Sequence, residues 1–176
     1  MQDIILKNGT KLIYKKISGH ITSFCIGFDA GAIREEGFPY GTAHVVEHMV
    51  FKETKNRKEQ EINLLCDEIF GFQNAMTNYP YVIYYGTTLS EEFHRGIEVF
   101  LDIVLNATLK EKGFREEMDI IKQELKDWKD DSDQYCEDKL FYNSFENRRI
   151  KELIIGNENS LNSITLNQIK AFYNKF

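Results

Sequence analysis

The segment His44-Val45-Val46-Glu47-His48 places two histidines and an acid at the spacing of one helical turn. Residues three and four apart share a face of an α-helix, because a turn takes about 3.6 residues. Two imidazoles on one face can be directed at a single divalent ion such as zinc. Glu47 lies near enough to act as a general base without binding the ion. The competing interpretation is a helix with two satisfied histidines and a solvated glutamate.

A zinc site with an open position needs a third protein ligand from elsewhere in the chain. Residues 114–128 have the pattern of a helix with one apolar stripe, and Glu117 and Glu124 lie along the edge of that stripe. The other acids of this helix point farther toward solvent. Glu117 and Glu124 are therefore the acids that we expect to face another packed element, although edge acids of this kind also occur simply in water.

The pattern around this segment predicts an α+β fold with an antiparallel sheet covered by helices. Asn8-Gly9 between two apolar runs predicts a hairpin, and alternation over 24–28 predicts a half-buried strand. Two further strands are expected over 72–77 and 81–88. Helices are expected over 43–51 with Thr42 as cap, over 57–70 with Gly71 as stop, from Ser90 to about Asn106, over 113–130, over 133–145, and from a capping box at Thr165 to Phe176.

Composition narrows the class of protein. The chain has 176 residues, of which 42% are apolar and 28% charged, so we expect a globular domain. Its net charge of −6 disfavours nucleic acid as a partner. No apolar run is long enough for a membrane span, and the first residues are too polar for a signal peptide. The three cysteines are far apart, which indicates a reducing, cytoplasmic location.

At these residues the sequence resembles the pitrilysin (insulinase) family of zinc metallopeptidases, whose inverted motif is H-x-x-E-H. That family carries a ligand glutamate about 75 residues after the motif, which matches Glu124 here. A second glutamate of the family lies seven residues before that ligand glutamate, which matches Glu117. Further family-like segments follow in order along the chain: Leu6-Lys-Asn-Gly9, Asp29-Ala-Gly31, Gly41-Thr-Ala-His44, Asn74-Ala75-Met76-Thr77 and Ile154-Ile-Gly156.

The resemblance implies a zinc-dependent endopeptidase that hydrolyses peptides or short unfolded polypeptides. By this resemblance, His44, His48 and Glu124 bind Zn²⁺, Glu47 is the general base, and Glu117 supports catalysis. Zinc would make its bound water more acidic, and Glu47 would take the proton.

The same resemblance implies that a peptide substrate lies as an added strand along an edge that includes Asn74, Ala75 and Thr77. The family's domain continues after the late helix with closing strands, and a second, similar domain follows. We therefore expect 1–176 to be one C-terminally short catalytic domain, with a homodimer partner or a complementary peptidase-family subunit. The alternative is a non-catalytic peptide-binding or assembly subunit of the same fold.

Overall fold

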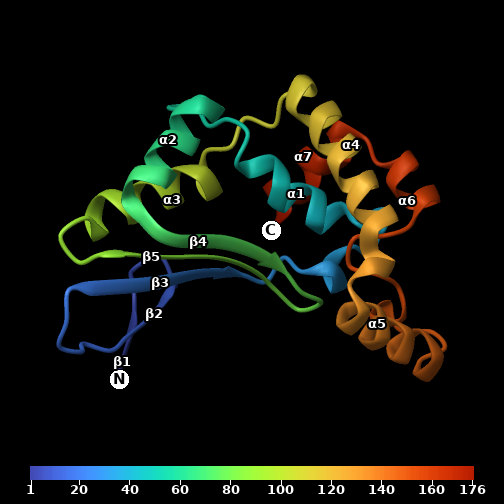
Figure 1. Cartoon of the computed structure of the whole chain (residues 1–176), viewed down its shortest axis with the longest axis horizontal. Coiled ribbons are helices and arrows are strands. Elements are labelled where there is room, and N and C mark those ends of the chain that lie inside the picture. The colour runs from blue at the N-terminus through green and yellow to red at the C-terminus, as the bar shows by residue number, and fades with distance from the viewer.

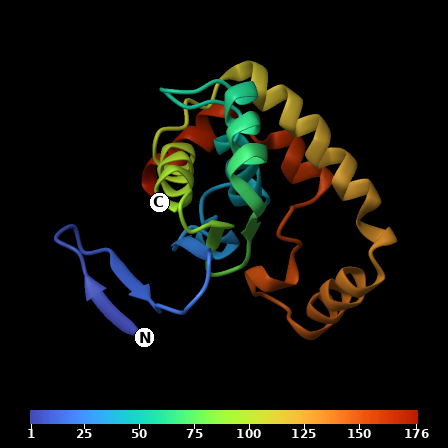
Figure 2. The same ribbon diagram turned by 60° about the vertical axis from the view of Figure 1, so that its left-hand side comes forward.

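The computed structural model describes all residues from Met1 to Phe176. A three-stranded antiparallel sheet carries a layer of helices on one side, and an N-terminal hairpin projects away from that layer (Figures 1 and 2). The predicted α+β class is confirmed. The elements in chain order are β1 (Gln2–Ile5), β2 (Lys11–Tyr14), β3 (Ile21–Phe28), α1 (Thr42–Val50), α2 (Glu59–Ile69), β4 (Phe70–Thr77), β5 (Val82–Leu89), α3 (Phe93–Leu105), α4 (Glu111–Asp127), α5 (Ser132–Ser144), α6 (Glu158–Ser163) and α7 (Leu166–Lys175), with short 3-10 turns at 32–34, 128–130 and 149–151.

The N-terminal hairpin forms where Asn8-Gly9 predicted it. Gly9 adopts a φ of +86°, a left-handed conformation that glycine reaches without strain. β1 pairs with β2 in antiparallel register, Ile4 opposite Leu12, and every residue of both strands is exposed. The hairpin thus forms its own two-stranded sheet and adds nothing to the main core.

The main sheet has the strand order β3-β5-β4, with both pairs antiparallel. Burial alternates along β3 and β5, as expected for a sheet with one covered face. On that face Phe24, Phe70 and Phe100 of α3 pack edge to face, with ring centroids 5.0–6.0 Å apart. β4 is one edge of this sheet, and its outer side faces the candidate site described below.

Three predicted helix boundaries were wrong, because each of the residues expected to mark one has another role in the fold. α1 is not capped by Thr42: Gly41 precedes it at a φ of +97°, and Thr42 donates its hydroxyl to Pro39. Ser90 does not cap α3, since its hydroxyl pairs with that of Thr22 and the helix begins at Phe93. Gly71 does not stop α2 but lies inside β4, which follows without a loop.

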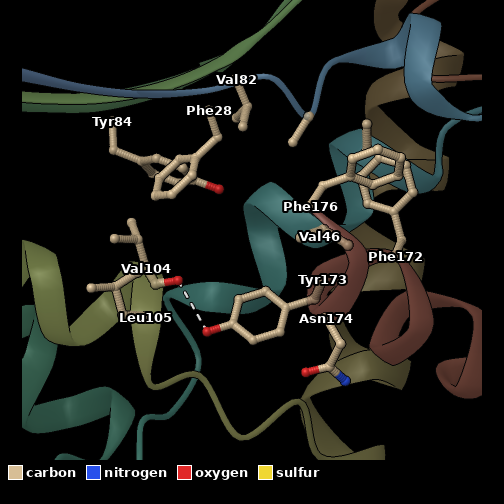
Figure 3. Close-up of a pocket in the computed structure, with 12 residues that line it drawn as sticks. Phe28, Val46, Val82, Tyr84, Val104, Leu105, Phe172, Tyr173, Asn174 and Phe176 are labelled. Carbon is tan, nitrogen blue, oxygen red and sulfur yellow. Dashed lines mark hydrogen bonds between the residues drawn. The ribbon is translucent and has the colours of Figure 1, made fainter. Parts of the chain in front are cut away.

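An apolar pocket of about 270 Å³ lies between the covered face of the sheet and helices α1, α3 and α7 (Figure 3). Val46 of α1, Tyr84 of β5 and Phe172 of α7 are among its lining residues. Tyr173 reaches across and donates a hydrogen bond of 3.0 Å to the carbonyl of Val104. α1 therefore turns Ala43 and Val46 toward this pocket, and its histidines lie on another side of the helix.

α7 begins at the capping box predicted at Thr165, with Gln168 as the reciprocal partner. The short α6 before it carries a second capping box, at Asn157, that was not predicted. None of the helices combines the length and apolar character that crossing a bilayer requires.

Candidate metal centre

α1 holds both histidines on its one polar face. Its other faces are packed into the core: Val45 and Met49 have no exposed surface. The side chains of His44 and His48 are 18% and 19% exposed, and their ring centroids are 4.6 Å apart. Because the buried faces fix the rotation of α1, the two imidazoles have a fixed common direction.

Glu124 of α4 meets this pair from a helix 76 residues further along the chain. Its Oε2 lies 3.7 Å from Nε2 of His48 and 4.0 Å from Nε2 of His44, and one ligand atom from each of the three residues lies within 4.8 Å of the others. Zinc bonds of about 2.0–2.2 Å place neighbouring tetrahedral ligand atoms roughly 3.4 Å apart. The separations exceed this spacing by at most about 1.4 Å, which rotations of the half-exposed Glu124 and of the two imidazoles can close, so this donor set fits zinc.

Glu117 is buried and contacts His48 without joining the cluster of His44, His48 and Glu124. Its Oε2 accepts a hydrogen bond of 2.9 Å from Nδ1 of His48. This contact puts the proton of a neutral His48 on Nδ1 and leaves Nε2, the nitrogen facing Glu124, with a free lone pair. Burial pushes the pKa of Glu117 upward, but the hydrogen bonds from His48 and Lys52 outweigh it, so this pKa lies below its usual range.

The two imidazoles have opposite pKa shifts. Burial, followed by the nearby charge of His48, lowers the pKa of His44 to about 3, and its Nδ1 is a buried atom with no hydrogen-bond partner. For His48, burial lowers the pKa. The hydrogen bond with Glu117 and the charges of Glu124 and Glu47 raise this pKa by more than burial lowers it, so the net shift is upward. A neutral imidazole is the form that binds metal, and His44 is in that form at neutral pH.

Glu47 lies between the histidines and the end of β4. Its Oε2 accepts a hydrogen bond from the hydroxyl of Thr77. Burial raises the pKa of Glu47, and the hydrogen bonds with Thr77 and the charge of His48 offset part of that rise. The chain thus holds a carboxylate beside the ligand cluster in a fixed orientation, as a general base requires.

Of the predicted substrate residues, two lie on the exposed edge and one does not. Asn74 is exposed on β4, its side-chain oxygen accepts the N–H of Ala75, and Ala75 is half-buried. Thr77 is buried, and its hydroxyl is committed to Glu47. Sequence reasoning missed this role, as it missed the contact of Lys52 with Glu117, because both pairs are far apart along the chain.

A cleft of about 520 Å³ opens beside the cluster, between β4 and the junction of α4 and α5. His44, Glu47 and Glu124 line one end of it. The opposite wall carries further carboxylates, from Asp127, Asp131 and Asp138, and the apolar residues 153–155. The cleft is therefore open to an extended chain and strongly acidic.

The sequence profile of the family described as Insulinase (Peptidase family M16) matches residues 11–158. The chain belongs to this family. The mitochondrial-processing peptidase subunit beta of Rattus norvegicus is 28% identical over 160 residues, which cover 91% of this chain and 33% of that protein. A protein of Rickettsia felis named an uncharacterized zinc protease is 28% identical over 172 residues, 97% of this chain and 42% of that protein.

Solved structures share the fold. A protease from Helicobacter pylori superposes with a TM-score of 0.87 at 23% identity over 98% of this chain and 42% of its own. An M16 domain from Pseudomonas fluorescens, described as inactive, has a TM-score of 0.84 at 16% identity over 97% of this chain and 42% of its own. The chain spans a third to about two fifths of the length of these proteins. It corresponds to one part of these M16-family proteins.

Proposed function

We propose that this chain is the catalytic half of a zinc-dependent endopeptidase. The observation that carries the proposal is the convergence of His44, His48 and Glu124 within 4.8 Å, from two helices far apart in sequence. Two neighbouring contacts support it: Glu117 lies at Nδ1 of His48, and the carboxylate of Glu47, on the same helix as the histidines, is held by Thr77.

When bound, zinc would supply a Lewis acid that polarises a peptide carbonyl and acidifies water. The chain's own side chains would bind the ion, set the tautomer of His48 and transfer the proton. His44, His48 and Glu124 would hold the ion, and Glu117 would keep His48 in the tautomer whose Nε2 is free. Glu47, oriented by Thr77, would take a proton from the attacking water and return it to the leaving amine.

The substrate we propose is an extended peptide, taken up along β4. β4 is an edge strand, so its outer backbone groups can pair with another strand whatever the sequence of that strand. The carboxylates of Asp127, Asp131 and Asp138 line the adjoining cleft and favour peptides with basic side chains. We expect kcat/KM to be higher for a basic peptide than for its neutral counterpart.

Metal content and one substitution test this function. The purified chain should contain zinc, and, with its partner present, cleave a quenched fluorescent peptide. Glu47→Gln should abolish cleavage while zinc stays bound, because the variant keeps all three ligands. Glu61→Gln, which changes an exposed glutamate of α2, is the matched control and should leave cleavage unchanged. Cleavage that survives in Glu47→Gln would refute the proposed mechanism.

A second candidate is a non-catalytic peptide-binding or assembly subunit. One observation favours it: the same fold is found in a domain described as inactive. This candidate predicts peptide binding without cleavage when zinc and every complementary subunit tested are present. Turnover by the zinc-loaded complex would exclude it.

We further propose that the active form contains a second copy or a complementary peptidase-family subunit. The exposed hairpin carries several large apolar side chains, among them Ile4, Ile5, Leu12 and Ile13, each at least 43% exposed. An unpaired strand edge with such residues favours association. Light scattering should give a mass above that of the monomer, alone or with the added subunit. A monomer that binds no such subunit would contradict this.

A further inference from the structure

Lys52 extends the metal centre to a residue outside the H-x-x-E-H motif. It lies two residues after the end of α1, between α2 and α4, with a side chain only 15% exposed. Its ammonium forms an ion pair with Glu59 of α2, and lies 3.1 Å from Oε1 of Glu117 and 3.5 Å from Oε2 of Glu116.

The stem of Lys52 is held as closely as its charged end. It lies against Gly113 in the first turn of α4, where an added Cβ would come 3.2 Å from Cβ of Lys52 and 3.3 Å from its Cγ. Glycine at this position leaves room for the lysine to run along the helix backbone. This packing fixes the direction from which the ammonium of Lys52 approaches Glu117.

Glu117 uses its two oxygens for two different partners. Oε1 faces the ammonium of Lys52, and Oε2 accepts the Nδ1 proton of His48. On the far side of the same ring, Nε2 of His48 faces Oε2 of Glu124 at 3.7 Å. A continuous series of contacts thus runs from Lys52 through Glu117 and His48 to the metal-facing atoms.

We propose that Lys52 is a positioning residue: it anchors one oxygen of Glu117 so that the other holds the proton of His48 on Nδ1 and keeps Nε2 free for the metal. The part of this inference that concerns zinc rests on the proposed function. The part that concerns the His48 tautomer does not, since it is a property of the metal-free protein.

The alternative state defines what is lost without Lys52. If the carboxylate of Glu117 is free to rotate away, Nδ1 loses its acceptor. The proton of a neutral His48 can then move to Nε2, where Glu124 is an acceptor on the opposite side. That tautomer blocks the atom that would bind the ion. Loss of a hydrogen-bond partner behind a metal ligand weakens metal binding by about 10- to 100-fold, and we expect Lys52→Met to fall in this range.

The experiment reads the His48 tautomer and the zinc affinity separately. Imidazole ¹⁵N shifts of the metal-free protein, in the neutral state of His48, distinguish Nδ1–H from Nε2–H. Zinc affinity is measured by competition with a chromophoric chelator. Wild type should show the Nδ1–H form. Lys52→Met should show a substantial Nε2–H population and weaker zinc binding, and Lys52→Arg should behave like wild type. Lys52→Ser, whose short side chain cannot reach Glu117 and leaves room for water, serves if Lys52→Met does not fold.

Two controls separate positioning from simple stabilisation. Glu59→Gln removes another ion pair of the same lysine. If Lys52 only stabilises the fold, this variant should behave like Lys52→Met. If Lys52 positions Glu117, the His48 tautomer and the zinc affinity should stay unchanged in Glu59→Gln. Lys58→Met removes an exposed lysine that pairs with Glu53 and should change neither. An unchanged tautomer and affinity in Lys52→Met, or in Lys52→Ser where that variant is used instead, would overturn the proposal. Wild type that binds no zinc would defeat the proposed function, while the tautomer would still decide the role of Lys52.

Discussion

Replacing Arg149 by methionine should destabilise the fold at the point where α1 begins. Arg149 donates two hydrogen bonds, of 2.8 and 2.9 Å, to Oε2 of Glu35, and its guanidinium stacks on Tyr40 at 4.5 Å. The other oxygen of Glu35 accepts the backbone N–H groups of Gly41 and Ala43, next to His44. The side chain of Glu35 is only 1% exposed, so no solvent would replace the lost arginine.

The size of the effect follows from this burial. Removing one partner of a buried ion pair costs about 3–5 kcal/mol. Glu35 would keep its two backbone donors, which places the expected loss near the lower end, at about 3 kcal/mol. In a domain of this size each kcal/mol corresponds to roughly 2–4 °C in melting temperature, so Arg149→Met should melt about 6–12 °C below wild type.

The loss should also depend on pH. Burial raises the pKa of Glu35 above its ordinary value, although Arg149 and the two N–H groups lower it in part. Removing Arg149 raises this pKa further. A carboxyl whose pKa is higher in the folded state destabilises the fold when ionised, and this cost disappears as the pH falls below its unfolded pKa. The stability deficit of Arg149→Met should therefore be largest at neutral pH and shrink in acid.

Urea unfolding followed by circular dichroism at neutral and acidic pH measures this directly. The exposed Arg148 next to it gives the matched control, Arg148→Met, which should change the free energy of unfolding by less than about 0.5 kcal/mol. A deficit below 1 kcal/mol for Arg149→Met, or one that is equal at both pH values, would refute the reasoning.

Three further substitutions test individual contacts. Thr77→Val removes the hydroxyl that orients Glu47 and should lower kcat/KM about tenfold or more, whereas Thr77→Ser should not; equal rates in both variants would exclude the orienting role. Gly41→Ala, at a φ of +97° and with a carbonyl 2.4 Å from the new Cβ, should lower the melting temperature more than Gly37→Ala, which meets no atom within 4 Å. Asp102 is buried, yet hydrogen bonds from its neighbours hold its pKa below the usual value. The ionised carboxylate therefore contributes stability that wild type loses as the pH falls through this pKa, and Asp102→Asn should remove part of that contribution. An unchanged acid unfolding curve in the variant would contradict this.

The sequence predicted those features that depend on neighbours within one turn. Asn8-Gly9 indicated the hairpin, and Thr165 with Gln168 indicated the last helix, because backbone conformation and reciprocal capping are local. Helical periodicity also placed Glu124 on the packed edge of α4. Periodicity did not predict how deeply each side chain is buried. It placed Glu117 and Glu124 on the same edge of the helix, whereas Glu117 is buried and Glu124 is half-exposed.

Features that depend on contacts between distant segments could not be predicted in this way. Thr42 has the right residue type for a cap, yet Glu35 takes the N–H groups at the start of α1 because the preceding loop folds back over them. Ser90 pairs with Thr22, 68 residues away, since β3 and β5 are neighbours. The partners of Glu47 and Glu117 likewise come from β4 and from the end of α1, which no local pattern indicates.

Metal analysis combined with X-ray absorption of the purified chain tests the central claim most directly. The account predicts one zinc per chain, bound by two imidazole nitrogens and a carboxylate oxygen, with the imidazole contribution reduced in His48→Ala and the oxygen contribution altered in Glu124→Ala. A chain that takes up no zinc, or zinc whose coordination is unchanged in both variants, would contradict it.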